Sequence, residues 1–179
     1  MTRSHRPIRM ALSCLIFSWA LCACSPVLDW RDVRPPASGI HALFPCKPSV
    51  EARSVSLGGA AVSMSMYACQ AGGSTFALAF ADLGDPSRVE GALSALSLAQ
   101  IQNMQASALV LGPMQVKGVP LHPQALRQRL VGKLPDGKPV QQEIGLFANG
   151  AWVFQVIVMS PHPDTEAVAT FFESLRLPE

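Results

Sequence analysis

The alternation of apolar and polar residues predicts several β-strands in the first half of the chain. Residues 62–69 alternate with a period of two, which is the pattern of a half-buried strand. The same alternation returns at residues 76–80 after the turn residues Gly72-Gly73, so the two runs predict a hairpin. Shorter strands are expected at residues 40–44 and 53–57, each followed by proline or glycine.

The second half begins with a predicted helix from Asp85 to about Gln105, since Asp85 is a suitable N-cap and Pro86 fits the first turn. An apolar stripe at helical spacing predicts a final helix after Asp164. Between the helices, strands are expected at residues 108–116, 125–134, 140–147 and 152–159, the last almost wholly apolar. Because hairpins dominate, the predicted fold class is α+β, with a single antiparallel β-sheet and two main helices packed on it.

The N-terminus has the pattern of a bacterial lipoprotein signal peptide, residues 1–23. Arg3, Arg6 and Arg9 precede an apolar run at residues 10–23, which is shorter than the roughly 20 residues that span a bilayer. The run ends in Leu21-Cys22-Ala23-Cys24, which resembles a lipobox, so we expect cleavage before Cys24 and lipid on its thiol. An ordinary secretory signal cut near Cys24 and an uncut signal anchor are the alternatives.

Lipidation of Cys24 would make the membrane the first partner of this protein, because each buried methylene contributes about 0.8 kcal/mol. Ser25 resembles the residue that follows the cysteine in outer-membrane lipoproteins. We therefore expect a location in the bacterial cell envelope, facing the periplasm, at the outer membrane rather than the inner. Residues 24–39 are expected to form a Pro-rich tether, and residues 40–179 the globular domain.

The charge of the mature chain argues against a nucleic-acid partner. Three of the 14 Lys and Arg residues lie in the signal peptide, which leaves 11 basic and 12 acidic residues after cleavage. Nucleic-acid binding requires a concentrated basic surface, which this composition does not favour.

Cys46 and Cys69 are the two cysteines beyond Cys24, and an even pair in an oxidising compartment predicts a structural disulfide. Two free buried thiols, or a redox or metal-binding pair, are the alternatives.

Two short motifs resemble those of small bacterial proteins with the PsbP-like α/β/α sandwich. They are Leu43-Phe44-Pro45-Cys46-Lys47-Pro48 and Phe171-Phe172-Glu173-Ser174-Leu175-Arg176-Leu177, so the resemblance covers roughly residues 38–178. Cys46 stands where the pattern has glycine, which fits a branch with a Cys46–Cys69 clamp. The resemblance implies binding or assembly roles without chemistry, although a fold does not by itself supply a function.

Among the residues that carry chemistry, we expect no catalytic, cofactor-binding or metal-binding set. The histidines His41, His122 and His162 are far apart in sequence, and Asp164 beside His162 is interpreted as a helix cap. The methionines, Met64, Met66, Met104, Met114 and Met159, are interpreted as core rather than as a copper site, with an apolar groove as the alternative. Arg127 and Arg129 share a strand face, and pairing with Gln141 and Glu143 would make a solvated, salt-bridged surface; anion binding is the alternative.

The predicted function is a membrane-anchored envelope lipoprotein that is not an enzyme, requires no cofactor, and binds or scaffolds another envelope protein. A carrier of a small apolar ligand and a periplasmic hydrolase with dispersed residues are the alternatives.

Overall fold

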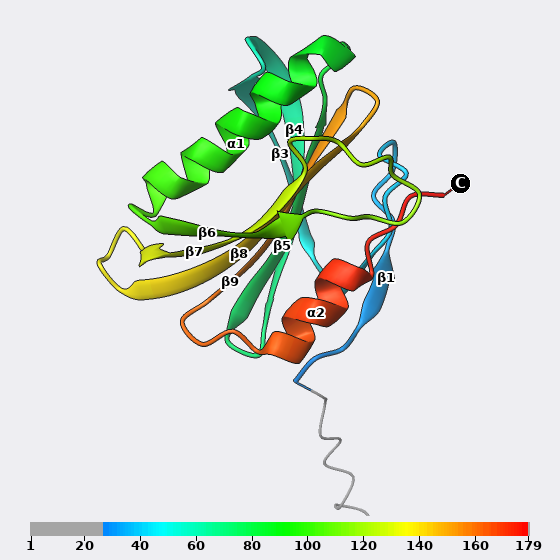
Figure 1. The fold of residues 1–179 in the computed structure, drawn as a ribbon. Coiled ribbons are helices and arrows are strands. Elements are labelled where there is room, and N and C mark those ends of the chain that lie inside the picture. Colours follow the sequence, from blue (N-terminus) through cyan, green and yellow to red (C-terminus); the bar gives the residue numbers. More distant parts are fainter. Residues whose placement is uncertain (1–26, 179) are drawn as a thin grey trace, which may run out of the picture.

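A seven-stranded antiparallel sheet with one helix on each face forms the body of the domain (Figure 1). The computed structural model describes residues 27–178, so the predicted signal peptide and Cys24 lie outside the described residues. The strands, in chain order, are β3 (Ser49–Leu57), β4 (Ala60–Ala71), β5 (Ser74–Asp82), β6 (Ser107–Pro113), β7 (Leu126–Lys133), β8 (Pro139–Asn149) and β9 (Trp152–Ser160). Their order in the sheet is β3-β4-β5-β9-β8-β7-β6, which places the last strand of the chain at the centre.

The two helices lie on opposite faces of this sheet. Ala92 and Leu93 of α1 (Val89–Asn103) pack in one hydrophobic core together with Val153 of β9. Phe171 of α2 (Thr165–Glu173) packs in the other core together with Phe154, the next residue of β9. Because successive strand residues point to opposite faces, the two cores are on opposite sides of the sheet. The α+β class predicted from the sequence is confirmed.

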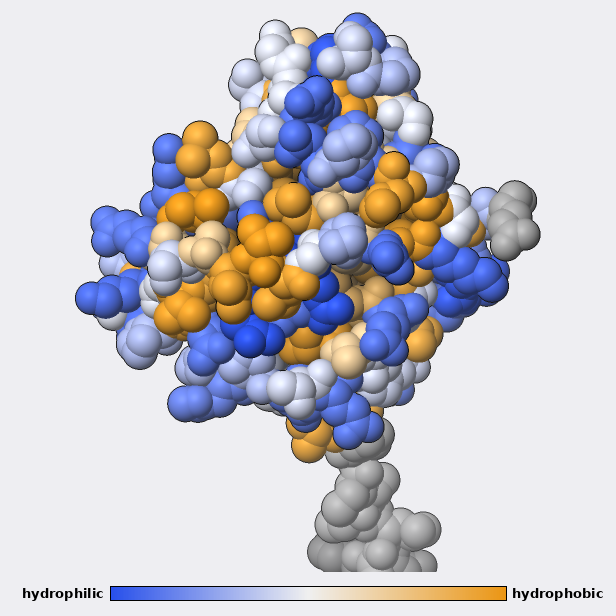
Figure 2. All heavy atoms as spheres, viewed as in Figure 1, coloured by the Kyte–Doolittle hydropathy of each residue, from blue (hydrophilic) through white to orange (hydrophobic). Residues whose placement is uncertain are grey.

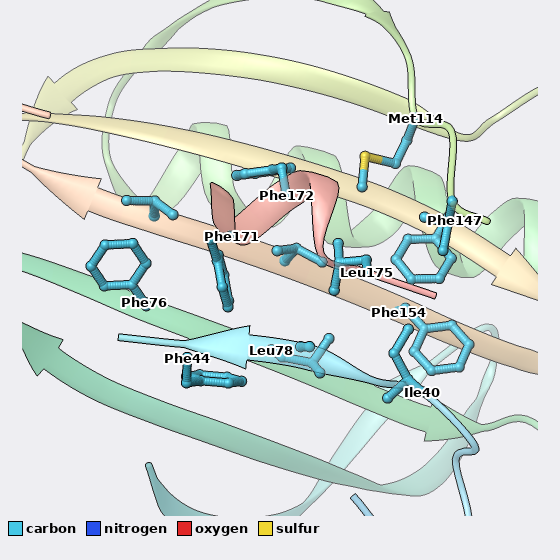
Figure 3. Packing of buried hydrophobic residues seen from close by; sticks show 14 of the residues in the cluster. Ile40, Phe44, Phe76, Leu78, Met114, Phe147, Phe154, Phe171, Phe172 and Leu175 are labelled. Atoms are coloured by element: carbon cyan, nitrogen blue, oxygen red, sulfur yellow. The ribbon is translucent and has the colours of Figure 1, made fainter. Parts of the chain in front are cut away.

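The α2-side core contains a group of phenylalanine rings that pack among aliphatic side chains (Figure 3). The rings of Phe147 and Phe154 stack with centroids 4.7 Å apart, across neighbouring strands. Phe171 meets Phe44 edge-on at 5.0 Å and Phe76 at 5.4 Å. Such offset and edge-on contacts are the favoured geometries for aromatic pairs. They fix α2 and the segment containing Phe44 against the sheet.

The prediction of a single sheet is wrong, because β1 (Arg31–Val33) and β2 (Ala42–Phe44) form a separate two-stranded antiparallel ribbon. Ala42 and Phe44 are fully buried in the α2-side core. Pro45 follows directly and has no backbone N–H to donate to a ladder, so the chain leaves the ribbon there before it enters the main sheet at β3. Burial of β2 against α2, rather than pairing with the main sheet, therefore determines the position of β2.

Part of the predicted tether, residues 24–39, is folded. Residues 31–33 form β1, and the ring of Trp30 lies edge-on to Phe76 with centroids 6.3 Å apart. The backbone N–H of Asp29 donates to the carbonyl of Pro45 at 2.8 Å. Leu28, Trp30 and Val33 pack against the α2-side core, whereas the prolines of this segment favour a tether in the sequence. Packing on the domain therefore begins near residue 28 and not at residue 40.

Asp85 and Asp164 act as N-caps, as the sequence predicts. The carboxylate of Asp164 accepts hydrogen bonds from the backbone N–H groups of Glu166 and Ala167, and α2 begins at the next residue. The carboxylate of Asp85 accepts from the N–H of Ser87, but the turn that it caps is the short 3-10 helix η1 (Pro86–Arg88), and α1 follows. Within residues 27–178, no helix is long and apolar enough to cross a membrane.

The predicted disulfide between Cys46 and Cys69 is present, with the two Cα atoms 6.0 Å apart. Cys46 follows β2, and Cys69 lies on β4 opposite Phe76 of β5. The bond therefore ties the β1–β2 ribbon to the main sheet, and it closes a covalent loop through β3.

Reduction of this disulfide is expected to lower the free energy of unfolding by about 3 kcal/mol, because the open chain gains conformational freedom in the unfolded state. Urea denaturation with and without reductant measures the change. The variant with both Cys46→Ser and Cys69→Ser should match the reduced protein and should not respond to reductant. Equal stability of the oxidised and reduced forms would contradict the role of the bond as a clamp.

Candidate binding site

An open hollow of about 780 Å³ lies between the β6–β7–β8 side of the sheet and the start of α2. We call it the arginine hollow. Its walls include Arg127, Arg129, Gln141, Glu143, His162 and Leu111. The first four come from two neighbouring strands, β7 and β8, and His162 comes from the loop that joins β9 to α2. Residues that are distant in sequence therefore share one concave surface.

Glu143 is the centre of the charge arrangement in this hollow. Its side chain is 10% exposed, and one carboxylate oxygen accepts from Arg127 through Nε and Nη2. The other oxygen accepts from Nη2 of Arg129 at 3.3 Å. Arg129 stands directly opposite Glu143 in the β7–β8 register. The predicted ion pairs with Glu143 are thus present, whereas Gln141 lies opposite Val131 and not opposite either arginine. The predicted solvated face is also only half correct, because Arg129 is exposed but its acidic partner is buried.

The guanidinium of Arg127 is also held by an aromatic ring. Its Cζ atom lies 4.2 Å from the centroid of Phe172 of α2, which is a cation–π contact. Phe172 reaches this position over Gly145, the residue opposite Arg127 in the register. A Cβ atom on Gly145 would lie 2.8 Å from Sδ of Met114 and 2.9 Å from Cε1 of Phe172, closer than packed atoms approach. Gly145 thus allows α2 to come near enough to position Arg127.

Sequence reasoning missed Gly145 and Phe172 as parts of the site. Phe172 belongs to the apolar stripe that predicts the last helix, and it is buried, at 3% exposure. The signal that could have identified the site is the glycine within a strongly predicted strand, since such a glycine often marks the close approach of another element.

The hollow carries a net positive charge. Its charged lining residues are Arg127, Arg129 and Glu143, so two positive charges meet one negative charge. Arg129 keeps 45% of its side chain exposed and can contact an incoming group. The first backbone N–H groups of α2 are already engaged by Asp164, so the helix start adds no free donors from Glu166 or Ala167. The arrangement favours an acidic group bound through Arg129.

The three candidate histidines, His41, His122 and His162, lie in separate surroundings. His162 lines the hollow, whereas Nδ1 of His122 accepts from the backbone N–H of Gln124 at 3.1 Å. His41 lies beside Asp32, with Nδ1 3.8 Å from the carboxylate. In residues 27–178, no group of three or more His, Cys, Asp or Glu side chains is placed to hold a metal ion.

The predicted methionine set is divided between the two cores. Met114 is buried on the α2 side, and Met104 is buried on the α1 side. Met64 and Met159 pack against the α1-side core. These four side chains contribute to packing, as the sequence interpretation expects, whereas the fifth, Met66, is half-buried and belongs to neither core.

Asp32 ties β1 to the end of the chain through charge. A hydrogen bond from Arg34 is the main factor that holds the pKa of Asp32 below its usual range; partial burial opposes it, while the charges of Arg34, Arg176 and His41 assist. Nη2 of Arg176 lies 3.6 Å from the Asp32 carboxylate, and the backbones of His41 and Arg176 exchange two hydrogen bonds. The first described strand and the last described segment are therefore fastened together.

Neither a protein-family model nor a curated protein matches this chain. The interpretation of the arginine hollow rests on its geometry and charge.

Replacing Glu143 with Gln is expected to lower the free energy of unfolding by about 2 kcal/mol, because two arginines lose their shared charged acceptor in a partly buried position. Glu51→Gln is the matched control, since Glu51 also pairs with an arginine, Arg53, but is 55% exposed. That control should change stability by less than about 0.5 kcal/mol. Urea denaturation of both variants makes the comparison, and equal effects would contradict a special role for the buried carboxylate.

Replacing Asp32 with Asn should remove a stabilising contribution that depends on pH. A carboxyl group with a lowered pKa in the folded state stabilises the fold above its unfolded pKa of about 3.9, and this stabilisation is lost as the pH falls through the folded pKa. The free energy of unfolding of the wild type should exceed that of Asp32→Asn by up to about 1 kcal/mol at neutral pH, and the difference should disappear once the pH falls below the folded pKa of Asp32. Urea denaturation across this range tests it, and a difference that persists in acid would contradict the role of the charge.

Proposed function

We propose that this protein is a membrane-anchored envelope lipoprotein that is not an enzyme and that uses the arginine hollow to bind an acidic group of an envelope partner. The net positive charge on preorganised walls is the observation that carries the proposal. Arg127 is fixed by Glu143 and Phe172, while Arg129 remains 45% exposed. Fixed donors lose little conformational freedom on binding, which favours recognition of a partner.

The path of the described N-terminus supports a site near the membrane surface. Leu28 lies 3.3 Å from the Cβ position of Gly72 in the β4–β5 turn. The carbonyl of Gly73 accepts from the hydroxyl of Ser160 at 3.3 Å, and that hydroxyl accepts from the N–H of His162 at 3.1 Å. If lipid is attached at Cys24, the chain to Leu28 spans at most about 14 Å. The proposed anchor and the His162 side of the hollow then belong to the same end of the domain.

We further propose that the domain is a PsbP-like α/β/α sandwich. Support comes from the two motifs on which the resemblance rests. Phe44 of the first motif and Phe171 of the second meet in the α2-side core, with ring centroids 5.0 Å apart. If such proteins share both motifs, one structural reason would explain it: the two motifs together attach α2 and β2 to the sheet. Binding and assembly are the roles that this resemblance implies.

The geometry of the hollow favours binding over hydrolysis. His162 and Glu143 line the same hollow, a pairing that a hydrolase could use. However, both carboxylate oxygens of Glu143 already accept from arginines, so this carboxylate is poorly suited to act as a base. The lining residues include the hydroxyl of Thr165 but neither serine nor cysteine.

The walls also give little support to a carrier of an apolar ligand. The predicted carrier would enclose its ligand between methionine and phenylalanine side chains, whereas the arginine hollow is open, and its lining residues include neither Met nor Phe but mix polar with apolar side chains. A mixed, open wall suits a protein segment better than a small apolar molecule.

The proposal is tested in bacterial cells that express the full chain, with a photo-reactive amino acid in place of Gln141 at the hollow. A control chain carries it in place of Val50, on the far edge of the sheet. We expect a discrete cross-linked protein adduct from position 141 and none from position 50. Mass spectrometry of the same material should show cleavage before Cys24 and lipid on that residue. An unmodified Cys24 would overturn the anchor, and equal adducts at both positions would overturn the binding site.

A further inference from the structure

In the described part of the chain, the strand β6 is an open edge of the main sheet, and nearly all of its residues are exposed. Its residues Ser107–Pro113 pair with β7 on one side, and β6 ends the strand order. Leu109 is 60% exposed, Val110 57% and Leu111 40%. Figure 2 shows apolar side chains gathered over this strand, with strongly hydrophilic residues directly beneath them. Three adjacent aliphatic residues on an open edge are an unusual exposure for a folded domain.

The opposite edge of the sheet is protected by charge, whereas β6 is not. The edge strand β3 carries Glu51 and Arg53, which form an exposed ion pair at 2.6 Å. Charged residues on an edge strand discourage the addition of another strand. The sequence of β6 contains no charged residue. The two edges of one sheet therefore differ in whether they admit a further strand.

The open edge continues into the arginine hollow. Leu109 stands opposite Arg129 in the β6–β7 register, so its side chain is on the hollow side. Leu111, Gly112 and Pro113 are themselves among the lining residues of the hollow. A strand added to β6 would thus present alternate side chains to a surface with a net positive charge.

We propose that β6 and the arginine hollow together bind an extended segment of a partner protein in which apolar residues alternate with acidic ones. This inference rests on the proposed function and names the chemistry of its partner. Backbone hydrogen bonds to the open edge would supply most of the affinity, as in other cases of strand addition. An acidic side chain on the hollow side would pair with Arg129 and supply the specificity.

A short peptide segment fits this edge better than a second copy of the chain. The register shifts between Val110 and Gly112, and Pro113 has no N–H, so the regular part of the edge is short. Three exposed aliphatic residues are far fewer than the roughly 20–30 residues that each side of a stable protein interface contributes. Pairing two β6 strands would also bring two positively charged hollows together.

The probes are three capped hexapeptides, in which Val alternates with Glu, with Lys or with Ser. Each is added at increasing concentration to the detergent-purified full chain, and amide hydrogen exchange is followed by mass spectrometry. The Val–Glu peptide should slow exchange in residues 107–113 and leave residues 49–57 unchanged. The Val–Lys peptide should need at least about a fivefold higher concentration for the same effect, because it meets Arg129 with like charge. The Val–Ser peptide should fall between the two.

Two variants with matched controls assign the effect to the site. Arg129→Gln should remove the preference for the Val–Glu peptide, whereas Arg53→Gln on the opposite edge should preserve it. Leu109→Asp should abolish protection by the Val–Glu peptide, whereas Val50→Asp should not. Circular dichroism checks that each variant is folded, and since all four positions are substantially exposed, folding should persist.

Equal protection by the Val–Glu and Val–Lys peptides, or no protection of residues 107–113, would overturn the proposal. Protection that rises with protein concentration in the absence of peptide would identify a second copy as the occupant and would overturn it as well. A cross-linked adduct at position 141 without protection of β6 would leave the proposed function standing while this inference falls.

Discussion

The burial of β9 on both of its faces is the constraint on which the rest of the domain depends. This strand pairs with β5 on one side and β8 on the other, and so joins the β3–β4–β5 hairpins to the β6–β7–β8 meander. Phe154, Val156 and Val158 face one core, while Val153 faces the other. A strand of this kind needs a covering layer on each side, which places α1 and α2 on opposite faces. Losing either layer would expose the centre of the sheet to water.

The two helical layers cover the sheet through different kinds of contact. On the α2 side the contacts are aromatic and close, and they hold Phe172 where it can support Arg127. On the α1 side the helix also meets the sheet through polar groups: Ser97 donates to Gln128 at 2.9 Å, and Gln142 donates to Gln100 at 3.1 Å. The layer with the aromatic contacts is the one that carries the candidate site, in agreement with the need to hold binding groups on well-packed elements.

Features with a local cause were accessible from the sequence. The period-two runs of β4 and β5, the caps Asp85 and Asp164, and the pairing of Cys46 with Cys69 depend on short patterns or on simple counting. The ion pair between Arg129 and Glu143 was also within reach, because hairpin register follows from the turn that precedes β8.

The remaining features depend on contacts between distant parts of the chain. Three residues of β1 carry little strand signal, and they are ordered by pairing with β2 and by the packing of Trp30. The burial of Glu143 and the contact between Arg127 and Phe172 require α2 to lie over β8, which no local pattern specifies. A site assembled in this way is visible only once the layers are in place.

Gly145 has a consequence for how proteins with the same site could be recognised. Its missing side chain makes room for Met114 and Phe172, and Phe172 in turn holds Arg127. A methyl group at this position would displace atoms from two separate segments at once. The glycine, the aromatic residue and the arginine therefore form one packing unit, and they should vary together among homologues. Covariation among these three positions would mark the relatives that retain the hollow, even where overall sequence similarity has faded.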